Sequence, residues 1–297
     1  MIKNGATKHE WQLTIHRRWD EWLYGKGKEA FEQVGDYSIQ SNPTVDKPVF
    51  FAGPWIGEFG WELSCWQGGI RELVHSLFGT HHVIVMGDPG HNVLYEYADE
   101  YWDVPEFFLN AGLTRQCAHV RGKKAPLYLS ALGYAVAVEL KKYSNVLKVV
   151  PPRRFRPEVQ EYIQLGGKNN TKRSSFCYFP RNRRWWKEKN WPFWDELIPL
   201  VEEETELNSV GITADWDLSD SIEMLRASHF AISPESGAIF LSFLCGIPTI
   251  AFGHEQQEKR LSKANVFGVP FVYNSRTDHN HSVEEVFYGI KELLRAL

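Results

Sequence analysis

Two carboxylates lie four residues apart in the glycine-rich stretch "AGPWIGEFGWELSCW". Glu58 follows Gly57 and Glu62 follows Trp61. A carboxylate can act as a general base toward a hydroxyl that lies within hydrogen-bond reach. An acid at the start of a helix can equally be only a partner for the helix dipole, so both interpretations stay open here. The glycine spacing is not GxGxxG, so the stretch does not predict a dinucleotide site.

A second stretch, "FPRNRRWWKEKNWPFW", combines cations with tryptophans. Guanidinium groups suit phosphate oxygens, and tryptophan faces suit sugars or bases. The alternatives are a solvated run of charge beside core tryptophans and a nucleic-acid-binding patch. The cations predicted to bind a phosphate donor are Arg181, Arg183, Arg184 and Lys187.

A third stretch, "ISPESGAIFLSFLCGIPTIAFG", places a polar turn between apolar segments. Ser236 and Gly237 begin a predicted helix, whose free N–H groups and positive dipole end suit a diphosphate. Glu235 could accept hydrogen bonds from ribose hydroxyls. Serine is also a common N-cap, so an ordinary capped helix is the alternative.

Two further motifs are weaker. Asp88 and His91 in "GDPGH" follow a predicted strand and are candidate acceptor contacts. Asp215 and Asp217 in "ADWD" have the Asp-x-Asp form of metal-dependent sugar transferases, although a helix cap explains them more simply. Histidines that lie close together in the sequence have no further ligand residues at the spacing that metal sites require, so we predict no metal site.

The elements that position these residues alternate between strand and helix in two sets, one from residue 48 and one from residue 174. Such alternation predicts an α/β fold with parallel sheets and right-handed crossovers. Ligands of open α/β sheets bind beyond the carboxyl ends of the strands, where the three stretches fall. The predicted parts are a helical extension with linker at 1–45, a Rossmann-like domain at 46–165, a second Rossmann-like domain at 166–280 and a C-terminal helix at 281–297 that could cross back.

The composition is that of a globular protein, with 43% hydrophobic and 24% charged residues and a net charge of −4. Any contact with nucleic acid would therefore need a local basic patch. The four cysteines form no CxxC pair, which favours reduced thiols. No signal-peptide core is visible, and no apolar run reaches the ~18 residues of a membrane span. We therefore expect a cytoplasmic protein without a membrane span.

The C-terminal half resembles the donor domain of GT-B glycosyltransferases. The segment "LSDSIEMLRASHFAISPESGAIFLSFLCGIPTIAFG" is similar to a segment of the lipopolysaccharide heptosyltransferase family (glycosyltransferase family 9), and so is the helix start "WPFWDELI". "GWELSCWQGGIREL" is similar to that family's Gly-Asp segment, whose Asp is the catalytic base. Glu62 then takes the Asp position, with Trp61 in place of Gly and Gly68 in place of Pro. A shifted register would give the role to Glu58.

The two alternating sets predict two Rossmann-like domains facing a cleft, with an N-terminal helical extension. The resemblance implies that 46–165 is the acceptor-side domain and 166–280 the nucleotide-sugar-binding domain. It also implies an inverting, metal-independent transfer from a nucleotide-diphosphate sugar, with no other cofactor. Arg181, Arg183 and Lys187 would neutralise the leaving diphosphate. The acceptor could be a glycan or a hydroxylated base in DNA, because the chain also resembles, more loosely, phage enzymes that glycosylate hydroxymethylated pyrimidines. The acidic net charge argues only mildly against DNA, because a single basic cleft is enough to bind it.

Other classes compete with this hypothesis. The chain could be a non-catalytic module that binds nucleotide sugars or nucleic acid on the same fold. A GT-A transferase built on "ADWD" and a nucleotide-sugar epimerase are further alternatives. The sequence predicts neither the sugar, the nucleotide nor the oligomeric state.

Overall fold

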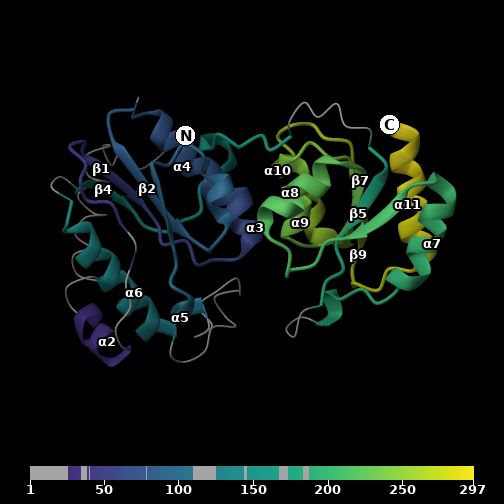
Figure 1. Cartoon of the computed structure of the whole chain (residues 1–297). Helices are drawn as coiled ribbons and strands as arrows, with labels where there is room; N and C mark the ends of the chain where they lie inside the picture. The colour runs from purple at the N-terminus through teal and green to yellow at the C-terminus, as the bar shows by residue number, and fades with distance from the viewer. Residues whose placement is uncertain are drawn as a thin grey trace, which may run out of the picture. The chain divides into compact units, whose positions relative to one another are not determined.

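A computed structural model describes residues 26–34, 39, 41–77, 79–109, 125–143, 146–166, 173–182 and 187–297. The chain divides into two compact units. Unit 1 comprises Met1–Glu58 and Gly69–Phe155, and unit 2 comprises Phe59–Gly68 and Arg156–Leu297. Each unit is built on a parallel sheet, which confirms the predicted α/β class (Figure 1). No helix in the described parts of the chain is long and apolar enough to cross a membrane.

Unit 1 contains a four-stranded parallel sheet in the order β3-β2-β1-β4. Its strands are β1 Val49–Ala52, β2 His82–Gly87, β3 Glu100–Asp103 and β4 Val146–Val150. Every residue of β1 is buried, as expected of a parallel strand covered on both faces. The helix α6, Ala125–Leu140, contributes Leu132 and Val136 to a core with Phe51 and Trp102. A second helix, α2 (Lys26–Val34), packs against α6.

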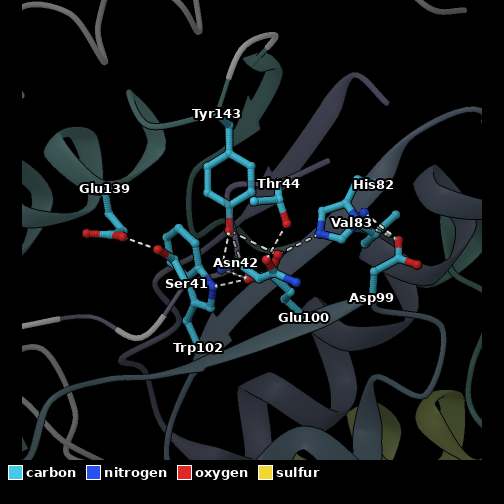
Figure 2. A network of polar contacts seen from close by, with 10 residues as sticks. All are labelled: Ser41, Asn42, Thr44, His82, Val83, Asp99, Glu100, Trp102, Glu139 and Tyr143. Atoms are coloured by element: carbon cyan, nitrogen blue, oxygen red, sulfur yellow. Dashed lines mark hydrogen bonds and ion pairs between the residues drawn. The ribbon is translucent and has the colours of Figure 1, made fainter. Parts of the chain in front are cut away.

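A polar network ties the amino ends of these strands together (Figure 2). Glu100, the first residue of β3, accepts hydrogen bonds from His82 at 2.7 Å and from Trp102 and Tyr143 at 2.9 Å. The backbone N–H of Asn42 adds a bond of 3.2 Å. Burial acts to raise the pKa of Glu100, but the bonds from Trp102, His82 and Tyr143 outweigh it and lower the pKa. The ionised carboxylate therefore fastens the segment before β1 to the sheet.

Unit 2 contains a five-stranded parallel sheet in the order β6-β5-β7-β8-β9. Its strands are β5 Ser175–Tyr178, β6 Asn208–Gly211, β7 Ser228–Pro234, β8 Thr249–His254 and β9 Phe271–Arg276. Its longer helices are α7 Trp194–Thr205, α8 Leu218–Arg226, α9 Gly237–Leu244, α10 Glu258–Ala264 and α11 Val283–Ala296. Within this unit, α8 and α9 lie on one side of the sheet and α7 and α11 on the other (Figure 1).

The side of the sheet beneath α7 and α11 has a continuous apolar core. Trp194 and Leu197 of α7 and Ile290 of α11 pack there with Phe230 and Ile250 of the strands. A capping box formed by Ser282 and Glu285 fixes the start of α11. This packing holds the strands whose carboxyl ends carry the predicted donor residues.

The strand order of unit 2 reverses between β5 and β7. After β5 the chain forms β6 on one side, and it then returns to form β7 on the other side of β5. Ligands of such sheets bind at this switch point, beyond the carboxyl ends of the two strands. The residues after Tyr178 and Pro234 are therefore the first place to look for a site.

Candidate functional site

A hydrogen bond joins the two chain segments at the switch point of unit 2. Arg181, three residues after β5, donates from its guanidinium to the backbone carbonyl of Glu235, which follows β7. The sequence placed both residues in the donor site, and the structure brings them into contact. A cation thus lies beside the first turn of α9.

The two oxygens of the Glu235 carboxylate differ in their partners. Lys189 binds its Oε1 at 2.7 Å, and the two side chains are 20% and 15% exposed respectively. Its Oε2 is buried without a hydrogen-bond partner among the described residues. A Cβ atom on Gly253 would lie 2.7 Å from the Cβ of Glu235, so only glycine leaves room for the carboxylate there. The free oxygen can accept a hydrogen bond from a ligand hydroxyl.

The first turn of α9 has a serine N-cap and lies against another segment of the chain. The Ser236 hydroxyl accepts a hydrogen bond from the N–H of Ala238 at 3.2 Å, which makes Ser236 the N-cap. A Cβ atom on Gly237 would lie 2.9 Å from the backbone nitrogen of Gly60. The backbones of Gly60 and Gly237 are therefore in contact, and the Phe59–Gly68 segment borders the helix start.

Glu62 lies in this bordering segment. The helix α3, Phe59–Trp61, continues into a π-helical turn, η1, that spans Glu62–Trp66. Glu62 is the first residue of η1 and is 1% exposed. π-helical turns are rare and occur frequently at functional sites. Beside it, the Cζ atom of Arg260 on α10 lies 4.0 Å from the centroid of the Trp61 ring.

Four predicted residues belong to unit 1. Glu58 is half-buried and directly precedes α3, and Gly57 packs so closely on Trp55 that a Cβ atom there would lie 2.7 Å from the ring. Asp88 and His91 follow β2 and are both buried. Their position at the carboxyl edge of the sheet is the predicted one, and their role toward an acceptor stays a prediction.

The basic stretch is only partly described. Arg183 and Arg184 lie outside the described residues, and Lys187 is exposed in the short turn η6, Lys187–Lys189. Lys189, at the end of the same run, was not predicted as a donor residue, although it is the cation that binds Glu235. The sequence feature that could have identified Lys189 is its position in the basic run. Arg260 lies on α10, and no motif in the sequence marks it.

Metal ligands are not clustered in the described part of the chain. No group of three or more His, Cys, Asp or Glu side chains there is placed to hold a metal ion. Asp217 of the "ADWD" motif stands at the N-cap position of α8, but its side chain forms no capping bond.

Comparison with known proteins gives structural matches alone. No protein-family model and no curated protein matches the chain. A similar solved structure is the iron-containing dodecameric glycosyltransferase TibC from enterotoxigenic E. coli H10407, with 15% identity, coverage of 86% of this chain and 79% of that one, and a TM-score of 0.46. Two others have 12% identity and a TM-score of 0.48. The E. coli ADP-heptose lps heptosyltransferase II covers 84% of this chain and 99% of its own, and the glycosyl transferase family 9 protein from Veillonella parvula DSM 2008 covers 86% and 99%. All three are glycosyltransferases.

Proposed function

We propose that the chain is a glycosyltransferase that moves a sugar from a nucleotide-diphosphate sugar to an acceptor hydroxyl. The observation that carries the proposal is the switch point of unit 2. There Arg181 and Lys189 flank Glu235 directly before the first turn of α9. Cations at a helix start suit a diphosphate, and a carboxylate oxygen without a partner suits a ribose hydroxyl.

Each residue has a distinct role in this proposal. Arg181 binds the diphosphate and stabilises the negative charge that grows on it as the sugar leaves. The N–H groups at the start of α9 add to the same stabilisation. Glu235 binds the ribose through its Oε2, while Lys189 pairs with Oε1 and holds the carboxylate in place.

The transfer itself requires a base. The acceptor oxygen attacks the anomeric carbon from the face opposite the diphosphate, and its proton passes to a carboxylate. The bond from the anomeric carbon to the diphosphate oxygen breaks, and its electron pair leaves with the diphosphate, so the configuration inverts. We assign the base to Glu62, because it shares unit 2 with the donor residues and lies two residues from Gly60, which contacts the start of α9. Glu58 is the alternative.

Paired glutamine variants test the base. Glu62→Gln should lower the turnover of the nucleotide sugar by about 10²- to 10⁴-fold, because the amide cannot accept the proton. The affinity for the nucleoside diphosphate should stay within a factor of two of wild type. Glu58→Gln makes the same chemical change four residues earlier. If Glu58→Gln removes turnover and Glu62→Gln does not, the base is Glu58. If neither affects turnover, the carboxylate mechanism is wrong.

A ligand screen tests the donor class. ADP, UDP, GDP, CDP and their sugars are compared by thermal shift, because a ligand that binds only the folded chain raises its melting temperature. We expect one nucleotide base to be preferred. A flat response to every nucleotide would contradict the proposal, and binding without turnover of any donor would favour a non-catalytic binding module.

A further inference from the structure

The π-helical turn that carries Glu62 is held by a distant part of the chain. Residues 160–166, here called the strap, pass along η1 and the end of α9. The Tyr162 hydroxyl donates to the backbone carbonyl of Ser64 at 3.0 Å, and the Gln160 amide donates to the same carbonyl at 3.1 Å. These residues follow Ser64 by 98 and 96 positions. Two side chains therefore converge on one carbonyl inside the turn.

Backbone contacts fix both ends of the strap. The N–H of Glu161 donates to the carbonyl of Gly68 at 2.9 Å. A Cβ atom on Gly68 would lie 3.1 Å from the carbonyl oxygen of Glu161, so a glycine there lets the strap pass closely. At the other end, Leu165 donates to the carbonyl of Leu244, the last residue of α9, at 2.7 Å. The strap thus links the turn to the helix whose start forms the proposed donor site.

Ser64 connects the residues held by the strap to the proposed donor site. Its hydroxyl donates to the carbonyl of Gly60 at 2.7 Å, and Gly60 contacts Gly237. Burial, and after it the charges of Cys65 and Glu158, raise the pKa of Tyr162. The hydroxyl therefore stays protonated and remains a hydrogen-bond donor at any working pH.

We infer that Tyr162 and Gln160 are positioning residues, which hold the η1 turn so that Glu62 keeps its place in the segment that contacts the start of α9. The inference rests on the proposed function, because the role of Glu62 as base is proposed there. Neither side chain needs to touch the substrate. Small displacements of a catalytic group are costly, since a shift of about 1 Å can reduce turnover by about 10²-fold.

The test removes the two hydrogen-bond donors of the strap and changes the shape of their side chains little. The full-length Tyr162→Phe/Gln160→Met variant is compared with wild type and with Tyr288→Phe, which makes the tyrosine change at an exposed position of α11. Three quantities are measured: amide hydrogen exchange across residues 60–69, release of nucleoside diphosphate from the donor sugar that the screen selects, and affinity for that nucleoside diphosphate.

We expect the double variant to exchange its 64–69 amides about five- to tenfold faster, because each lost hydrogen bond weakens the turn. Turnover should fall by about tenfold or more, with nucleotide affinity within a factor of two. Tyr288→Phe should match wild type in all three. Unchanged exchange, or a loss of affinity as large as the loss of turnover, would overturn the inference.

Glu62→Gln separates this result from the proposed function. If Glu62→Gln retains full turnover, the base assignment fails, and the positioning role of the strap fails with it even where exchange accelerates. If Glu62→Gln is inactive while the double variant turns over normally, the proposed function stands and the positioning inference is wrong.

Discussion

Glu235 is the residue whose chemistry the structure defines most closely. Lys189 satisfies one carboxylate oxygen, and the other is buried near Gly253 without a partner among the described residues. An acid between apolar strands is costly to bury unless its charge is paired, and Lys189 supplies that pairing. The sequence predicted that Glu235 and Arg181 would share a site. It did not predict that Lys189 would be the residue to pair with Glu235, because the run offered several cations at equivalent spacing.

Glu235 should determine the preference for ribose. In Glu235→Gln, the preference for UDP over 2′-deoxy-UDP, or for the equivalent pair of the nucleotide that binds, should fall by about fivefold, since one hydrogen bond is worth ~1 kcal/mol. Isothermal titration with both nucleotides measures this. Glu292→Gln, an exposed change on α11, should leave the preference unaltered. An undiminished preference in Glu235→Gln would show that another group reads the ribose.

Glu100 should make the stability of unit 1 depend on acid pH. Because the pKa of Glu100 is lower in the folded chain, its contribution is present above the unfolded pKa of 4.5 and is lost as the pH falls through the folded value. Glu100→Gln should cost about 1–3 kcal/mol at pH 7 and progressively less below pH ~4.5. Urea unfolding at pH 7 and at acid pH, with Glu72→Gln on the surface of helix α4 (Gln67–His75) as control, measures this. A cost that does not shrink at acid pH would contradict the assignment.

At the scale of elements, the parallel strands were predictable and the π-helical turn was not. Apolar runs such as "HFAIS" and "PTIAFG" lie between turn residues, and the structure forms β7 and β8 there. The sequence "ELSCW" fits an ordinary helix equally well. Its π-helical form coincides with contacts from the strap, which lies nearly 100 residues away, and local patterns do not report such contacts.

The contact between α3 and α9 should depend on two glycines. Gly237→Ala would gain helix propensity, but its Cβ would lie 2.9 Å from backbone atoms of Gly60, which cannot move as a side chain can. Gly60→Ala is milder, with its Cβ 3.2 Å from the Gly237 Cα. We expect Gly237→Ala to destabilise unit 2 by about 1–3 kcal/mol and Gly60→Ala by less. Denaturant unfolding followed by fluorescence would show the order, and a stabilised Gly237→Ala would mean that the two backbones do not touch.

At the scale of the whole molecule, the chain passes between the two units three times. The segment Phe59–Gly68 is grouped with unit 2, although the residues on both sides of it belong to unit 1. The predicted boundaries follow changes in composition along the chain. They carry no signal for Phe59–Gly68, because its grouping depends on contacts such as Gly60 with Gly237 and Ser64 with Tyr162.

The central claim is that the switch point of unit 2 binds a nucleoside diphosphate. Arg181 and Arg173 provide a matched pair, because they lie after and before the same strand, β5, and Arg173 is exposed. Isothermal titration measures the affinity of both alanine variants and of wild type for the nucleoside diphosphate that the screen selects. The account predicts that Arg181→Ala weakens binding by about 10- to 100-fold, from the loss of a charge-assisted contact worth about 1.5–3 kcal/mol, while Arg173→Ala binds as wild type. Equal affinities for wild type and Arg181→Ala, or equal losses in the two variants, would contradict it.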